Sequence, residues 1–283
     1  MKILDGTKVA KKIYSDITKK IAKMNKKPVL AVILVGNDPA SKLYVSIKEK
    51  KCLQVGIGIQ IKNYELRIRN KANIYNLQKK IITQIQKLNK DKNVSGIIVQ
   101  LPLPKGLDTN KIIETIDPKK DVDGLNPLNI GKLLIGDKDV IAPPTAAGIL
   151  KLLENYKINL SGKHIVMVGY GKLVGKPLAN MIAVANSDAT LTICDKKTKN
   201  LSSFTKQADI LISATGVGHL IKAGMIKNNA IIIDAGTSTI GGKIVGDVDF
   251  EKVKNKASYI TPTKGGVGPM TVAMLLENVV NLK

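Results

Sequence analysis

The chain has 283 residues, of which 44% are hydrophobic and 24% are charged. This composition is typical of a globular protein and excludes a disordered or collagen-like chain. The length allows two domains. The longest apolar runs, residues 29–35 and 226–235, fall short of the roughly 20 residues that cross a bilayer, so we expect no membrane partner.

Charge is the most unusual property of the composition. Lys and Arg total 45 against 22 Asp and Glu, which gives a formal net charge of +23. The excess is spread along the chain as Lys, Arg occurs only as Arg67 and Arg69, and aromatic residues make up 3%. Nucleic-acid binders usually concentrate Arg and interleave stacking aromatics. We therefore expect no nucleic-acid partner, and interpret the basic surface as suited to a polyanionic small substrate.

The N-terminal residues and the cysteines favour a cytoplasmic setting. Residues 1–6 read MKILDG, without the apolar core or the small-residue cleavage site of a signal peptide. The two cysteines, Cys52 and Cys194, are far apart in sequence and have no neighbours at metal-ligand spacing.

The first half of the chain predicts alternating strands and helices. Residues 29–35 (VLAVILV) are wholly apolar, as in a buried parallel strand, and Asp38 with Pro39 then opens a helix to about residue 54. The pattern continues with strands at 57–62 and 94–99 and helices at 74–88 and 108–116. This alternation predicts a parallel α/β domain.

A second α/β unit follows a loop-rich stretch at residues 117–131. It contains predicted strands at 163–168, 189–194, 210–213 and 230–234, with helices at 174–185 and 269–281. We predict an α/β fold of two domains with a cleft between them. Residues 1–140 would form the first α/β domain, and residues 141–264 a Rossmann-type dinucleotide-binding domain. Residues 265–283 would return to the first domain.

A glycine-rich turn follows the strand at 163–168. Gly169, Gly171 and Gly175 form GxGxxxG rather than the usual GxGxxG, and such glycines let the backbone approach a pyrophosphate at a helix N-terminus. Asp195 ends the next strand, where a carboxylate commonly binds an adenosine ribose. Lys196 follows and could instead attract a 2′-phosphate, so on physical grounds NAD and NADP both remain open.

Candidate catalytic residues lie in the first half. Tyr44 and Lys48 share one helical face, with Ser41 one turn earlier, and a ring beside an amine suits a flat aromatic ligand. Gln100 ends a predicted strand, where open α/β sheets bind ligands. From spacing alone, the simpler interpretation of Lys48 is an ordinary exposed lysine on a helix rather than a catalytic residue. The carboxylates of residues 117–124 are flanked by lysines, so we expect no metal site. The histidines, His164 and His219, are isolated and read as structural.

Several segments together resemble the bifunctional methylenetetrahydrofolate dehydrogenase/methenyltetrahydrofolate cyclohydrolase family. They are VGNDPASKLYVSIKEKKCLQVGI (35–57), GIIVQLPLP (96–104), KDVDGLNPLNIGKL (120–133), GDVDF (246–250), ASYITP (257–262) and GGVGPMT (265–271). The resemblance covers essentially the whole chain and keeps the motifs in order. It implies that residues 1–140 are a folate-binding catalytic domain and that residues 141–264 bind NAD(P).

The resemblance implies roles for individual residues. Lys48 matches the essential lysine, Tyr44 the tyrosine that stacks on the folate, Gln100 the glutamine that hydrogen-bonds the lysine, and Asp123 the aspartate that anchors the pterin. Gly266 and Pro269 are carried over as further substrate-binding residues. The implied cofactor-binding residues are Gly169, Tyr170, Gly171, Asp195, Lys196, Thr215, Gly216 and Thr237.

The implied reactions belong to one-carbon metabolism and feed purine biosynthesis. 5,10-Methylenetetrahydrofolate is oxidised with NADP, and the methenyl product is hydrolysed to 10-formyltetrahydrofolate. Polyglutamylated folates and a homodimer are the implied partners. The rival interpretations are a dehydrogenase without hydrolysis, a shikimate-type dehydrogenase and a basic nucleic-acid-binding protein.

Departures from the family pattern concern mainly the cofactor. Tyr170 stands where the family usually has arginine, and Asp195-Lys196 where it usually has His-Ser, so NAD is an alternative to NADP. Other departures are Asn126, Pro144, Ala146 and Lys264.

Overall fold

The computed structural model describes residues 1–65, 71–185 and 188–282, and its chain divides into two compact units. The three-stranded unit comprises Ile13–Gly131 and Leu275–Lys283, and the six-stranded unit comprises Met1–Lys12 and Lys132–Met274. Three helices belong partly to each unit: α1 (Gly6–Ala22), α5 (Pro127–Ile135) and α10 (Val267–Asn281). The functional division at residues 140 and 264 stays a prediction.

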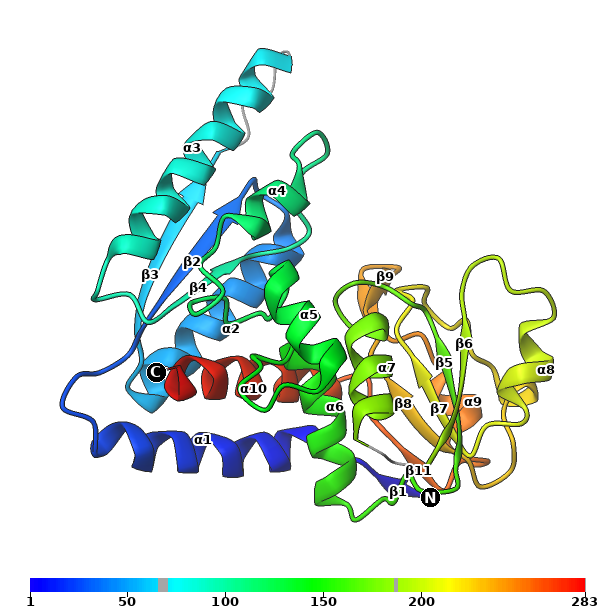
Figure 1. The fold of residues 1–283 in the computed structure, drawn as a ribbon. Helices are drawn as coiled ribbons and strands as arrows, with labels where there is room; N and C mark the ends of the chain where they lie inside the picture. The colour runs from blue at the N-terminus through cyan, green and yellow to red at the C-terminus, as the bar shows by residue number, and fades with distance from the viewer. Residues whose placement is uncertain (66–70, 186–187, 283) are drawn as a thin grey trace. The chain divides into compact units, whose positions relative to one another are not determined.

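The sheet of the three-stranded unit has the order β3-β2-β4 (Figure 1). Its strands are β2 (Val29–Val35), β3 (Gly58–Tyr64) and β4 (Gly96–Val99), and both pairings are parallel. The helices between and after them are α2 (Pro39–Val55), α3 (Lys71–Lys90) and α4 (Thr109–Glu114). The predicted parallel α/β arrangement is confirmed, with each predicted element present and its ends shifted by a few residues.

The central strand β2 is covered on both faces, which explains its continuous apolar sequence. Ala31, Ile33 and Val35 pack in one core cluster with Ile81 and Ile85 of α3. Helix α2 packs against β2 and β3 but contributes no residue to that cluster. Since side chains alternate along a strand, α2 and α3 cover opposite faces of the sheet.

The six-stranded unit contains one wholly parallel sheet, in the order β1-β11-β8-β7-β5-β6, where β1 is Lys2–Ile3 and β11 is Tyr259–Ile260. The predicted strands are β5 (His164–Val168), β6 (Thr190–Cys194), β7 (Ile210–Ser213) and β8 (Ile231–Asp234), and the predicted helix is α7 (Gly175–Val184). The fold is the predicted Rossmann type. Because β5 lies between β6 and β7, the chain reverses its direction of progress across the sheet there, and such a position is where these folds bind ligands.

Several elements were not predicted from the sequence. They are β1 (Lys2–Ile3), α1, α5, α6 (Pro144–Asn155), α8 (Leu201–Thr205), the 3-10 turn Ala223–Met225, the hairpin of β9 (Ser238–Ile240) and β10 (Lys243–Val245), α9 (Phe250–Val253) and β11 (Tyr259–Ile260). Helix α1 did have a signal, because its buried residues Val9, Ile13, Ile17 and Ile21 recur every four positions. In the part of the chain that the structure describes, no helix has the length and apolarity of a membrane span.

Candidate functional site

Lys48 and Gln100, predicted from distant parts of the sequence, meet in the three-stranded unit. Lys48 is on α2 with 7% of its surface exposed, and its Nζ donates a hydrogen bond of 2.8 Å to Gln100 Oε1. Gln100 directly follows β4, and its Nε2 donates to the carbonyl of Leu101 at 2.7 Å. This second bond fixes the side-chain amide with its oxygen toward the lysine.

The capping of α2 explains how Lys48 is presented. Asp38 accepts a hydrogen bond from the Ser41 amide at 2.7 Å, and Gly56, with a φ of 90°, ends the helix. The buried face then includes Ser41, Val45, Lys48, Cys52 and Val55. Tyr44 lies one turn before Lys48 and is 37% exposed, so part of its side chain is accessible to an aromatic ligand.

Burial makes Lys48 an unusual amine. It lowers the pKa of Lys48, and the charge of Asp123 opposes that shift without cancelling it. Burial raises the pKa of the Cys52 thiol to about 12, so Cys52 is neutral near pH 7. The result is a lysine that loses its proton more easily than an exposed one, as a general base requires.

Asp123 has the opposite shift. Its burial raises the pKa of the carboxyl to about 6, against the charge of Lys48, which lowers it. Its neighbour Val122 is fully buried and leaves room only for glycine at position 96, since a Cβ there would lie 2.3 Å from Val122 Cγ1. Asn278 donates to the Val122 carbonyl at 2.9 Å. The loop that carries Asp123 is thus held from both sides.

The first acid of this loop serves the loop itself. Asp121 is fully buried, and its Oδ2 accepts from the Asn126 amide at 2.7 Å and from Asn129 Nδ2 at 3.0 Å. Asn126 also donates to the Ile116 carbonyl and accepts from the Leu128 amide. Asn126, the residue that departs from the family pattern, therefore organises the start of α5. The described residues contain no group of three or more His, Cys, Asp or Glu side chains that could hold a metal ion.

On the six-stranded unit, the glycine turn after β5 fits a dinucleotide pyrophosphate. Gly169 has a φ of +98°, and a Cβ there would lie 2.5 Å from the Ala214 carbonyl. A Cβ on Gly175 would lie 2.2 Å from the Gly169 carbonyl, whereas one on Gly171 would meet no described atom within 4 Å. Gly169 and Gly175 thus permit close packing, and Gly171 leaves open space at the N-terminus of α7. Val174, the N-cap residue before this helix, makes no side-chain cap.

Tyr170 and Asp195 flank this turn. The Lys176 amine lies 5.6 Å from the Tyr170 ring centroid, so the tyrosine that replaces the family's arginine has its own cation. Strands β5 and β6 pair with Val168 beside Cys194, which brings Gly169 and Asp195 to the same sheet edge. Asp195 and Lys196 are exposed, and Asp195 Oδ1 accepts from the Lys196 amide at 2.8 Å.

Thr215, Gly216 and Thr237 border the same edge on the other side of β5. Thr215 and Gly216 follow β7, and Thr237 precedes β9. Gly216 has a φ of +70°, and a Cβ there would come within 3.8 Å of the Thr237 carbonyl. Unlike these, Gly266 and Pro269 lie near the start of α10, where a Cβ on Gly266 would lie 2.4 Å from the Pro262 carbonyl. The roles of all these residues stay predictions.

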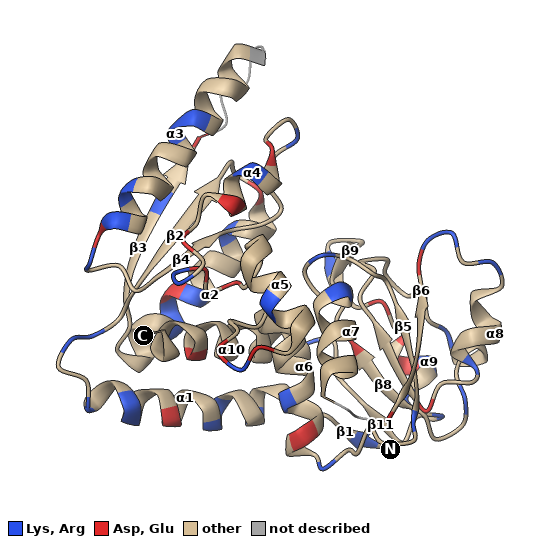
Figure 2. Cartoon of the chain, in the orientation of Figure 1, with Lys and Arg blue, Asp and Glu red and all other residues tan. Residues whose placement is uncertain are grey.

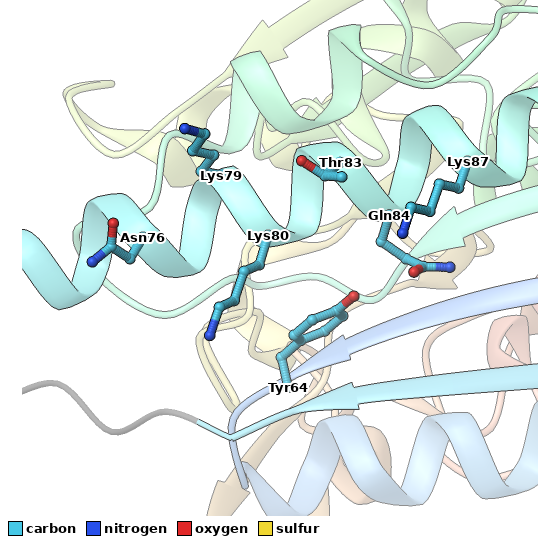
Figure 3. Close-up of a pocket in the computed structure, with 7 residues that line it drawn as sticks. All are labelled: Tyr64, Asn76, Lys79, Lys80, Thr83, Gln84 and Lys87. Atoms are coloured by element: carbon cyan, nitrogen blue, oxygen red, sulfur yellow. The ribbon is translucent and has the colours of Figure 1, made fainter.

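A separate cavity of about 500 Å³ lies between α3 and β3. Figure 3 shows the Tyr64 ring beneath α3, with lysine side chains extending beside it. None of its lining residues is a predicted site residue: Tyr64, Asn76, Lys79, Lys80, Thr83, Gln84 and Lys87. Since α3 and α2 cover opposite faces of the sheet, this cavity is distinct from the Lys48 site.

The histidines and two further acids complete the survey. His164 pairs its Nε2 with Thr192 Oγ1 at 2.8 Å, and the exposed His219 adopts a φ of 56° in a turn. Both positions suit the structural role predicted for them. Sequence reasoning did not single out Asp234 and Asp247, which are buried at the edge where the Rossmann strands end. The sequence offered little signal for either residue: Asp234 directly follows an apolar run, and Asp247 directly follows a glycine.

The fold and site define a two-domain α/β dehydrogenase-type protein with a Rossmann domain. The chain belongs to the tetrahydrofolate dehydrogenase/cyclohydrolase family. Residues 4–123 match the model of that family's catalytic domain, and residues 143–283 match the model of its NAD(P)-binding domain.

Relatives match over nearly the whole chain. A bifunctional protein FolD from Hydrogenobaculum is 48% identical over 98% of this chain and 97% of its own. The crystal structure of a bifunctional methylenetetrahydrofolate dehydrogenase/cyclohydrolase from Campylobacter jejuni has a TM-score of 0.91 at 43% identity, covering 99% of this chain and 97% of its own. The dehydrogenase-cyclohydrolase from Trypanosoma brucei, complexed with NADP cofactor and inhibitor, has a TM-score of 0.91 at 32% identity, covering 99% and 96%.

Proposed function

We propose that this chain carries out two consecutive reactions of one-carbon metabolism. It oxidises 5,10-methylenetetrahydrofolate to the methenyl form with NADP or NAD, and it hydrolyses the methenyl form to 10-formyltetrahydrofolate. The observation that carries the proposal is the buried Lys48, whose pKa is lowered by burial and whose amine is held by Gln100. It occurs in a chain that matches both domain models of the family.

For the oxidation, the protein has mainly to position its ligands. The bound dinucleotide supplies the hydride acceptor. Tyr44 offers an exposed ring for stacking against the folate, and Asp123 offers a carboxyl for the pterin. Gly169, Gly171 and the start of α7 would hold the pyrophosphate. No acid or base is needed at the hydride itself.

The hydrolysis requires proton transfer, and Lys48 is the group we assign to it. Water adds to the methenyl carbon, the bond between that carbon and N5 breaks, and one proton is released overall. Neutral Lys48 accepts one proton from the adding water and returns it to N5 as the bond breaks, while the carbinol hydroxyl loses the other proton to solvent as it becomes the formyl oxygen. Gln100 acts as a positioning residue, because its Oε1 accepts from Nζ and aims the amine.

The test is a spectrophotometric assay with 5,10-methylenetetrahydrofolate, run with NADP and NAD in parallel. Reduced cofactor and methenyl product are followed together. Both activities predict reduced cofactor without lasting methenyl product. Accumulating methenyl product would mean a dehydrogenase alone, and no turnover with either cofactor would contradict the proposal.

The remaining partner assignments are also proposals. We assign a cytoplasmic location, supported by two free, buried cysteines. We also assign a homodimer and polyglutamylated folates, the latter supported by a net charge of +23. Lysines occur on helices of both units (Figure 2). Sedimentation would measure the oligomeric state. A KM for the folate substrate that falls as glutamates are added to it would support the preference for polyglutamylated folates.

A further inference from the structure

Two buried carboxylates hold the loops where β7 and β8 end. Asp234, the last residue of β8, is 6% exposed, and Asp247 is fully buried. Asp234 Oδ1 accepts from the amides of Gly236 and Asp247 at 3.1 and 3.0 Å, and its Oδ2 accepts from the Val248 amide at 3.0 Å. Asp234 therefore ties together both ends of the segment that contains the β9–β10 hairpin.

Asp247 extends this network to the loop after β7. Its Oδ2 accepts from Ser213 Oγ at 2.8 Å and from the Thr215 amide at 2.6 Å. Thr215 Oγ1 in turn accepts from the Val217 amide at 3.1 Å. One buried carboxylate oxygen thus sets the direction of the Thr215 backbone and, through it, the turn of residues 215–217.

The surrounding backbone is shaped to these carboxylates. A Cβ on Gly236 would lie 1.9 Å from Asp247 Oδ1, and a Cβ on Gly246 would lie 1.9 Å from Asp234 Oδ2. Asp247 Oδ1 is buried without a hydrogen-bond partner among the described residues. Burying acids with an unpaired oxygen is costly. A positional role for the network would explain why this cost is tolerated.

Sheet topology indicates which part of a dinucleotide this network faces. The order β8-β7-β5-β6 places the glycine turn, our pyrophosphate site, in the middle. Asp195 at the end of β6 lies on the adenosine side. Thr215, after β7, lies on the opposite side of β5. A dinucleotide that crosses β5 with its adenosine over β6 therefore directs its nicotinamide half over β7 and β8.

We propose that Asp247 is a positioning residue for the nicotinamide half of the dinucleotide, acting through the Thr215 amide and the turn of residues 215–217. This inference rests on the proposed function, because it requires that the six-stranded unit binds NAD(P). Asp247 needs no contact with the cofactor. Its effect is to hold one conformation of the loop before the ligand arrives.

The experiment compares Asp247→Ala with Asp247→Asn by calorimetric titration of NADP and of 2′,5′-ADP, which represents the adenosine half alone. The alanine variant loses the acceptor for Ser213 and Thr215, so we expect its Kd for NADP to rise by about tenfold or more. Its Kd for 2′,5′-ADP should stay within about twofold. The asparagine variant keeps an acceptor oxygen and places its amide nitrogen where Oδ1 has no partner, so it should bind NADP much as the parent does.

Two further readouts separate positioning from general damage. Hydrolysis of added methenyltetrahydrofolate uses Lys48 and should be retained in Asp247→Ala. Amide hydrogen exchange in residues 214–218 should become faster. If Asp247→Ala does not fold, Ser213→Ala is measured in its place. We then expect a smaller rise in the Kd for NADP and again faster amide exchange in residues 214–218.

Three outcomes would overturn the inference. They are an unchanged Kd for NADP, an equal loss of NADP and 2′,5′-ADP binding, or an asparagine variant as weak as the alanine variant. Failure of the parent protein to bind any dinucleotide would instead contradict the proposed function.

Discussion

Side chains form the Lys48 site, whereas the backbone forms the proposed dinucleotide site at the carboxyl ends of the strands of the six-stranded sheet. The buried amine of Lys48 donates a hydrogen bond to the Gln100 amide oxygen, and the nearby Asp123 carboxyl has a pKa of about 6. At the proposed dinucleotide site the backbone packs so closely around Gly169 and Gly175 that neither position has room for a Cβ. Substitutions should therefore change protonation and rate at the first site, and loop geometry and affinity at the second.

The largest expected effect is at the amine. Lys48→Met should lower the rate of methenyltetrahydrofolate hydrolysis by about a thousandfold or more, because no other described group is assigned to the proton transfer. Folding should persist, since a buried amine is replaced by an apolar chain of similar length. The exposed Lys50→Met is the matched control and should retain full activity. Retained hydrolysis in Lys48→Met would remove the catalytic assignment.

The glycine turn allows packing and ligand binding to be separated. In Gly175→Ala the new Cβ would lie 2.2 Å from a backbone oxygen, so we expect a loss of about 1–3 kcal/mol in the free energy of unfolding. Gly171→Ala meets open space and should leave stability nearly unchanged while raising the Kd for NADP. Denaturant unfolding and calorimetric titration measure the two effects. Equal losses of stability in both variants would contradict this separation.

The buried acid of the six-stranded unit gives a pH prediction. Burial raises the pKa of Asp234 to about 6 from an ordinary value of 3.8. The folded state therefore holds the proton more tightly, and the stabilisation present below pH 4 is lost as the pH rises through about 6. The loss is on the order of 2–3 kcal/mol.

Asp234→Asn tests that prediction, because it cannot lose this proton. The difference in unfolding free energy between the parent and the variant should shift against the parent between about pH 4 and pH 6. Urea unfolding across this range measures it. The exposed Asp16→Asn serves as control and should give a difference without this slope. A parent that gains stability relative to Asp234→Asn as the pH rises would show the opposite sign.

The smallest effect concerns the choice of cofactor. The exposed Asp195 carboxylate would repel a 2′-phosphate, while Lys196 beside it would attract one. Asp195→Asn should raise kcat/KM with NADP relative to NAD by several-fold, and Lys196→Ala should change the ratio in the opposite direction. Initial rates with both cofactors test this. An unchanged ratio in both variants would mean that neither side chain reaches the 2′ position.

Local patterns were sufficient to predict most of the parallel architecture. The run VLAVILV is buried as β2, and the Asp38-Pro39 signal does begin α2. The short strands β1 and β11 were missed because two residues form a strand only when a neighbouring strand supplies its hydrogen bonds. Gln100 was recognisable from its place after a strand, whereas helical spacing alone left Lys48 as one lysine among many and only the family resemblance singled it out.

By itself, the sequence determined most of the long strands and helices of the two parallel sheets and which family motifs are present, because apolar patterns and motifs depend on residues near one another in the chain. Only the tertiary structure decided that Lys48 is buried and bonded to Gln100, 52 positions away, and that Asp247 reaches the Thr215 amide. The physical reason is that burial and long-range hydrogen bonds set the pKa and orientation of a group, and both arise only when distant segments pack together.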